Sequence, residues 1–252
     1  MSRYYFLLCS LPSLHFNVPP EISFEEVIER ISLNVSESDK ERVKAFLSYI
    51  DLLNLKALWL GHPIDLRGNF TEKELDEALL VYDFFPEYLY DFLERYPERK
   101  EKVHFFPFLL NAFFKEERSG FLGEYFSYER EVRMLLAALR AKDSGREIAE
   151  ELQFEDPHDP FIAYILAQKD MVAFEPPKEY EQIKILYKKY KESPKDLNKA
   201  LLEMKFNWID EKEQEDIFTI DQLLTYMAKL YLLEYWHSLT EKNGQIMMER
   251  MG

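Results

Sequence analysis

The chain has 252 residues, of which 47% are apolar, with 20 Phe and 16 Tyr, so it can bury a sizeable core and is not a disordered chain. Its 47 acidic and 32 basic residues give a formal charge of −15, which argues against nucleic acid as a partner because phosphate backbones repel such a chain. The seven glycines favour helices over a sheet-rich fold, the single cysteine excludes an internal disulfide, and no apolar run approaches the roughly 20 residues that span a bilayer.

The opening stretch, residues 3–24, has an apolar run that is too short for a secretory signal and that Pro12 interrupts. We expect a short buried segment there, either a strand or one or two helical turns, followed by extended chain. Cys9 within it is expected to be a buried, inert thiol. Ser23 is placed to cap the next helix, which carries two glutamates in its first turn.

Two amphipathic helices are expected next. Apolar residues recur at three- and four-residue steps over residues 43–60, and Gly61 supplies a natural C-terminal stop. Thr71 and Glu74 have the spacing of a capping box, which predicts another helix that begins at Thr71 and runs through Leu80.

Aromatic residues crowd the stretch from Asp83 to Phe114, which Pro86, Pro97 and Pro107 divide into short or kinked helices. Aromatic pairs at helical spacing usually pack inward, so a role in the core is expected. A partner-binding face is the alternative, because large exposed aromatic patches mark interfaces. The side chains concerned are Phe84, Phe85, Tyr88, Tyr90, Phe92, Tyr96, Phe105, Phe106, Phe108, Phe113 and Phe114.

The clearest helical pattern covers residues 120–142, where apolar side chains alternate steps of four and three. Glu129 and Arg133 lie one turn apart on the side that is expected to face solvent. A short helix is expected next, over residues 146–152, before a turn at 155–160 that is interpreted as a lobe boundary.

The third part of the chain is also predicted to be helical. Asp159 and Pro160 suit the cap and first position of a helix over residues 161–168. A striped helix follows with Tyr180, Ile183, Tyr187 and Tyr190, and Ser193 with Pro194 is expected to start another. The lysines of the striped helix, expected to be a solvated face rather than a phosphate site, are Lys184, Lys188, Lys189 and Lys191.

The last long helix is predicted over residues 219–240. Its apolar positions form two adjacent stripes, so the helix must be covered on most sides and is expected to be central. The stripes are Ile220, Leu224, Met227 and Tyr231 beside Leu223, Tyr226, Leu230 and Leu233.

Three of these helices share a weak internal pattern. Residues 51–61, 131–142 and 226–237 each offer an acidic residue that is followed three places later by Asn54, by Met134 and by His237, respectively. The spacing of the three copies is uneven, which excludes a regular solenoid, and amphipathic helices alone can produce such a coincidence.

Three motifs in these helices resemble the C subunit of V/A-type ATPases, which is called d in the eukaryotic enzyme. They are the Asp-x-x-Asn-Leu helix from Asp51, the LRAK-x-x-G helix end at residues 139–145, and a final helix that carries Ala228, Lys229 and Glu234. The opening YYFLLCSLPSL followed by Pro-Pro is similar to a small bacterial family encoded within V-type ATPase operons. Met134 and His237 depart from the asparagine of the first copy, and the chain is shorter than its archaeal counterpart.

The resemblance implies an all-α fold of three helical lobes related by a weak pseudo-threefold repeat, in one domain with approximate lobes 1–82, 83–155 and 156–252. It implies a non-catalytic rotor subunit that couples the central stalk to the membrane ring of proteolipid subunits. The partners are then those subunits, with no nucleic acid, small-molecule substrate or cofactor. The location is the cytoplasmic face of the membrane, reached through the complex. Which residues contact the stalk or the ring is not implied.

The polar residues offer few chemical alternatives. Glu234 and His237 have a spacing that can ligate a metal in a helical bundle, but a second copy and further carboxylates are not evident. His158-Asp159 with His104 resembles metal-dependent phosphohydrolases of the His-Asp type, although Pro160 places the pair before a helix rather than within one. No glycine-rich phosphate loop is present. We therefore assign no catalytic, cofactor-binding or metal-binding residue.

Two hypotheses stand beside the rotor subunit. One is an all-α adaptor or assembly factor that binds the same complex transiently. The other is a helical-bundle metalloenzyme that uses Glu234 and His237.

Overall fold

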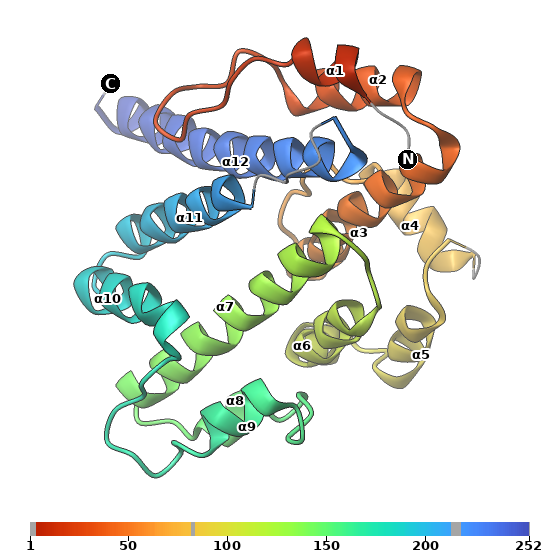
Figure 1. The fold of residues 1–252 in the computed structure, drawn as a ribbon. Coiled ribbons are helices and arrows are strands. Elements are labelled where there is room, and N and C mark those ends of the chain that lie inside the picture. The colour runs from red at the N-terminus through yellow and green to blue at the C-terminus, as the bar shows by residue number, and fades with distance from the viewer. Residues whose placement is uncertain (1–3, 82–83, 213–217, 252) are drawn as a thin grey trace. The chain divides into compact units, whose positions relative to one another are not determined.

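The structure is a computed structural model that describes residues 4–81, 84–212 and 218–251, with only the backbone described for 240–251. The chain is 70% helix, and no strand occurs in the ranges just given, which confirms the all-α prediction (Figure 1). Residue 3 of the opening stretch and Asp83, where the aromatic stretch begins, lie outside the described residues.

The helices have the following bounds. They are α1 (Tyr5–Cys9), α2 (Phe24–Asn34), α3 (Glu37–Leu60), α4 (Glu72–Leu80), α5 (Glu87–Arg95), α6 (Arg99–Lys115), α7 (Phe121–Asp143), α8 (Ile148–Glu151), α9 (Pro160–Leu166), the short 3₁₀ helix η1 (Lys178–Tyr180), α10 (Glu181–Tyr190), α11 (Pro194–Glu211) and α12 (Ile220–Met251).

Helix starts follow the capping residues that the sequence indicates. Ser23 and Thr71 each accept a hydrogen bond from the backbone N–H three residues later and complete a capping box. The Asp159 side chain accepts from two backbone N–H groups at the start of α9. Ser193 occupies the cap position of α11, but its hydroxyl donates to Asp196 instead. Gly61 ends α3 with a φ of +71°, a conformation that favours glycine.

The chain forms two compact units that interleave along the sequence. Unit 1 contains Met1–Arg42, Gly120–Leu122 and Ile185–Gly252, and unit 2 contains Val43–Ser119 and Gly123–Lys184. The lobes 1–82, 83–155 and 156–252, which follow the chain in order, stay a prediction. The turn at 155–160 lies within unit 2.

Unit 1 is built around α12. This helix packs against α11 and α2, and α1 packs on α2. The apolar stripes of α12 are buried at Leu223, Leu224, Met227, Leu230 and Leu233, which confirms the prediction that the helix is covered. Its helical backbone continues to Met251, beyond the predicted end at residue 240.

Unit 2 contains the aromatic stretch, whose rings pack mainly on one another. Trp59 stacks on Phe92 with ring centroids 5.9 Å apart, and Tyr96 stacks on Phe105 at 4.2 Å. Of the aromatic residues expected in this stretch, only Phe84 and Phe108 count as exposed. The predicted core role is confirmed for Tyr90, Phe92, Phe106 and Phe113, which are buried, whereas the other five of these residues are half-buried.

Two features of unit 2 differ from the sequence-based expectation. Pro107 lies inside the continuous helix α6 and does not divide it. Glu129 is buried rather than facing solvent, and the Arg133 side chain pairs with the buried Glu155. The reason is that α7 is covered on more than one side, so Phe126 and Met134 are buried as well as the predicted stripe.

The length and polarity of the helices bear on membrane insertion. Within the described residues, none of the helices has the length and apolar character that crossing a bilayer requires.

Candidate functional site

The first of the three related helices, α3, uses its acidic residue and its asparagine to hold the loop that follows it. Asp51 is 1% exposed and accepts hydrogen bonds from Asn69 Nδ2 at 2.7 Å and from the Phe70 backbone N–H at 3.3 Å. Asn54 donates to the Asp65 carbonyl at 2.8 Å and accepts from the Asp65 backbone N–H at 2.7 Å. These four bonds hold the loop between α3 and α4 at two points, Asp65 in its middle and Asn69–Phe70 near its end.

Burial of Asp51 has a chemical consequence. Removal from water disfavours its charged form and raises the pKa of the carboxyl group to about 6, against the opposing effect of the hydrogen bonds from Asn69 and Phe70. The fit around the carboxylate is also close, because a Cβ on Gly68 would lie 2.2 Å from Asp51 Oδ1. Only glycine therefore fits at position 68 without displacing this side chain.

In α7, the second helix that carries the weak pattern, the acidic residue also accepts a hydrogen bond, but from a different kind of donor. The Tyr180 hydroxyl donates to Glu131 Oε2 across unit 2. Burial raises the pKa of Glu131, and burial together with the carboxylate raises the pKa of the Tyr180 hydroxyl. Met134, which stands where α3 has its asparagine, is 1% exposed and packs in the core.

In the third related helix, α12, Glu234 Oε1 accepts a hydrogen bond of 2.6 Å from the backbone N–H of Phe24. Phe24 is the first residue of α2, so this carboxylate binds a helix N-terminus, where N–H groups lack intrahelical partners and negative charge is favoured. His237 Nε2 is buried without a hydrogen-bond partner.

The three acidic residues thus do the same thing. Asp51, Glu131 and Glu234 each accept a hydrogen bond from a segment that lies elsewhere in the chain. Each carboxylate is thus engaged by a partner within the protein. We call these residues the acidic anchors.

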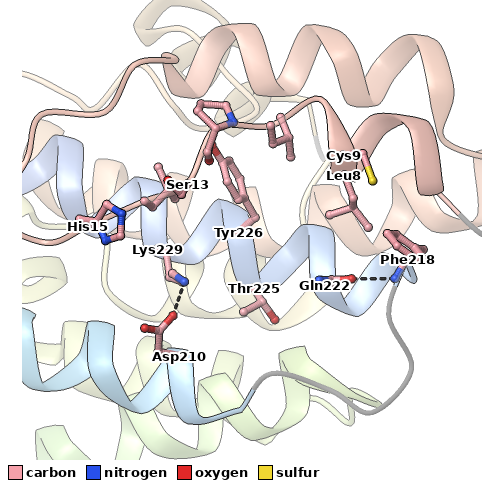
Figure 2. A pocket seen from close by; sticks show the side chains of 13 residues that line it. Leu8, Cys9, Ser13, His15, Asp210, Phe218, Gln222, Thr225, Tyr226 and Lys229 are labelled. Atoms are coloured by element: carbon pink, nitrogen blue, oxygen red, sulfur yellow. Dashed lines mark hydrogen bonds and ion pairs between the residues drawn. The ribbon is translucent and has the colours of Figure 1, made fainter.

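Unit 1 contains a pocket of about 400 Å³ between the chain that follows α1 and helices α11 and α12 (Figure 2). Four of its polar side chains are tied to protein partners. Lys229 pairs with Asp210, the Tyr226 hydroxyl donates to the Pro12 carbonyl at 3.0 Å, and Gln222 accepts from the Phe218 backbone N–H at 2.7 Å. These four groups therefore already serve the fold.

The residues considered for metal chemistry are not brought together. His158 and His104 are both exposed, and Asp159 caps α9 while it accepts from Arg130 at 3.0 Å. Glu234 binds the start of α2, as described above. In the part of the chain that the structure describes, no group of three or more His, Cys, Asp and Glu side chains is arranged to hold a metal ion.

Cys9 was expected to be buried, and this expectation is wrong. The thiol is free and exposed at the end of α1. The reason is that this five-residue helix buries one face through Leu7, and a residue two positions further along a helix points away from that face. The lysine prediction is confirmed for Lys188 and Lys189, which are exposed, whereas Lys184 pairs with Glu175.

Two buried ionic clusters were not anticipated from the sequence. In unit 2, Glu155 binds Arg130 and Arg133, each with a nitrogen–oxygen distance of 2.9 Å. In unit 1, Asp221 accepts from the Phe121 backbone N–H at 2.9 Å and pairs with Arg42. The partners lie 22 residues or more apart, so no local spacing rule points to them.

A model of the family described as "Protein of unknown function (DUF2764)" matches residues 1–251. An uncharacterized protein of Chlamydia muridarum is 29% identical over 234 residues, which cover 89% of this chain and 88% of that protein. An uncharacterized protein of Chlamydia pneumoniae is 26% identical over 257 residues, which cover 98% and 96%. No solved structure matches the chain. Because the family model spans nearly the whole sequence, this chain belongs to the DUF2764 family.

Proposed function

We propose that this protein is a non-catalytic rotor component of the central stalk in a bacterial V/A-type ATPase, where it couples the stalk to the membrane proteolipid ring. It would be the counterpart of the component called C in archaeal and d in eukaryotic enzymes. In this role it would lie at the cytoplasmic face of the membrane through its partners. The proposal starts from the resemblance carried by the Asp51 helix, the LRAK-x-x-G helix end and the final helix.

The acidic anchors are the observation that supports the proposal most directly. Chance similarity among amphipathic helices would reproduce apolar spacing, but it does not require that the acidic residue of each helix be engaged within the protein, as Asp51, Glu131 and Glu234 are. Each of them accepts a hydrogen bond either from another helix or from the loop that follows its own helix. Engagement of the acidic residue at the equivalent position of each helix is expected if the three helices descend from one helical module.

A rotor component that couples two parts of a machine transmits force through packed surfaces, so it must resist deformation. Helices α3 and α7 are long, with 24 and 23 residues, and each carries an acidic anchor, buried Asp51 in α3 and half-buried Glu131 in α7. The chain has only seven glycines, which limits backbone freedom. Close-packed interiors have low compressibility and transmit strain, and in unit 2 the buried rings of Phe113, Tyr125 and Phe126 pack on one another.

The test is the composition of the ATPase complex from a bacterium that encodes this chain. The complex would be purified through a tag on another of its proteins, and the chain would be quantified by mass spectrometry against the other stalk proteins. We expect one copy for each copy of a stalk protein. Deletion of the chain should leave ATP hydrolysis by the catalytic head intact while ion pumping is lost.

Two other outcomes would decide against the proposal. Absence of the chain from the purified complex would refute any stable role in it. Presence in partly assembled complexes, together with loss from the mature complex, would favour an all-α assembly factor instead.

A further inference from the structure

Helices α1 and α2 of unit 1 pair in a register that two hydrogen bonds define. The Tyr4 hydroxyl accepts from the Ser36 backbone N–H at 3.3 Å, and Arg30 Nη1 donates to the Ser10 carbonyl at 3.2 Å. The two helices therefore run in opposite directions, side by side (Figure 1). The same register places the middle of α1 level with Leu33.

This pairing leaves large apolar side chains uncovered. Phe6 in α1 is 88% exposed and Leu33 in α2 is 84% exposed, and both lie at nearly the same level along the helix pair. Tyr5, the neighbour of Phe6, is 53% exposed. Both Phe6 and Leu33 lie away from the buried residues of their helices, and exposed apolar side chains that are bordered by polar residues mark interaction sites.

The border of this surface is acidic. Glu25 and Glu29 are exposed and lie on the same side of α2 as Leu33, since the three residues are spaced one turn apart. Between Tyr4 and Asp39 the sequence has a single basic side chain, Arg30, and that side chain is bound to Ser10. We call Phe6, Leu33, Glu25 and Glu29 together the α1–α2 face.

We propose that the α1–α2 face docks a basic amphipathic helix of another protein, with apolar residues set against Phe6 and Leu33 and lysine or arginine against Glu25 and Glu29. This inference does not rest on the proposed function. Charge decides the choice of partner, because a second copy would bring like charges together on a chain that already carries −15. An anionic membrane surface would be repelled in the same way.

The chain offers a convenient probe, because its single cysteine, Cys9, is exposed and lies three residues after Phe6 on the same side of α1. A fluorophore on Cys9 would be titrated with two synthetic amphipathic helices of about 18 residues, or five turns. The two helices share one apolar stripe, which is flanked by lysines in the first and by glutamates in the second.

We expect the lysine-flanked helix to bind at least about tenfold more tightly than the glutamate-flanked helix. The double variant Phe6→Ser/Leu33→Ser should weaken that binding about tenfold or more, and Glu25→Lys/Glu29→Lys should reverse the preference between the two helices. Val172→Ser, which changes a fully exposed apolar side chain in unit 2, is the matched control and should bind as the unchanged protein does.

Three results would overturn the proposal. If the lysine-flanked helix bound Phe6→Ser/Leu33→Ser as tightly as the unchanged protein, the interaction would be only the general electrostatic attraction of a negatively charged chain. A dimer in sedimentation that Phe6→Ser/Leu33→Ser dissociates would identify a second copy as the occupant. Binding to vesicles of anionic lipid that the same variant abolishes would identify a membrane surface.

Discussion

Replacement of Asp51 by asparagine should change how the stability of the protein depends on pH. The pKa of the carboxyl group is about 6 in the folded chain against the ordinary value of 3.8, so the folded state favours the protonated form. The corresponding stability is fully present below pH 3.8 and is lost as the pH rises through about 6. At 1.36 kcal/mol for each pKa unit, the loss is about 3 kcal/mol. Asparagine does not ionise, so the free energy of unfolding of Asp51→Asn does not include this pH-dependent loss.

The assay is denaturant unfolding of the unchanged protein and of Asp51→Asn from about pH 4 to about pH 7.5, where the titration lies. The free energy of unfolding of the unchanged protein, minus that of the variant, should fall by about 2.4 kcal/mol across this range, because about 0.6 kcal/mol of the loss has already occurred at pH 4. Asp76→Asn, at an exposed carboxylate of α4, is the matched control and should show a much smaller change. Parallel pH profiles for the unchanged protein and Asp51→Asn would refute the reasoning.

Substitutions at two further positions, one in each unit, test the acidic anchors. Gly68→Ala should lower the free energy of unfolding by about 1–3 kcal/mol, because the new Cβ would lie 2.2 Å from Asp51 Oδ1, and an unaltered denaturation midpoint would contradict this close fit. Glu234→Ala should cost about 1–2 kcal/mol through the loss of the acceptor for the Phe24 N–H, measured by denaturant unfolding. Glu234→Gln, which keeps an acceptor oxygen, should recover most of that loss, and equal effects of the two substitutions would exclude the hydrogen bond as the cause.

Helix starts were predictable because their causes are local. Ser23 with Glu26 and Thr71 with Glu74 are three residues apart, and the hydrogen bonds that they make are those that this spacing favours. The buried stripe of α12 was predictable for a similar reason, since a helix that is apolar on most sides must be covered.

The packing around individual polar residues was not predictable in this way. The amphipathic pattern of α7 places Glu129 and Arg133 opposite the main apolar stripe, and only the folded chain shows that neighbouring elements cover that side too. The partner of Arg133 is Glu155, 22 residues away beyond a turn and a short helix. The acidic anchors were visible as a weak pattern, but what each one binds depends on the tertiary fold.

The interleaved units have a consequence for synthesis on the ribosome. By the time Lys184 has been added, the nascent chain contains every residue of unit 2. Helix α2 has been made by then. The partner of α2 is α12, and the hydrogen bond from the Phe24 N–H to Glu234 spans 210 residues, so α12 has not yet been translated. Helix α2 must therefore stay without this partner while more than a hundred further residues are translated. Translation therefore completes unit 2 before unit 1, and α2, one of the first helices to be made, is among the last to meet its partner.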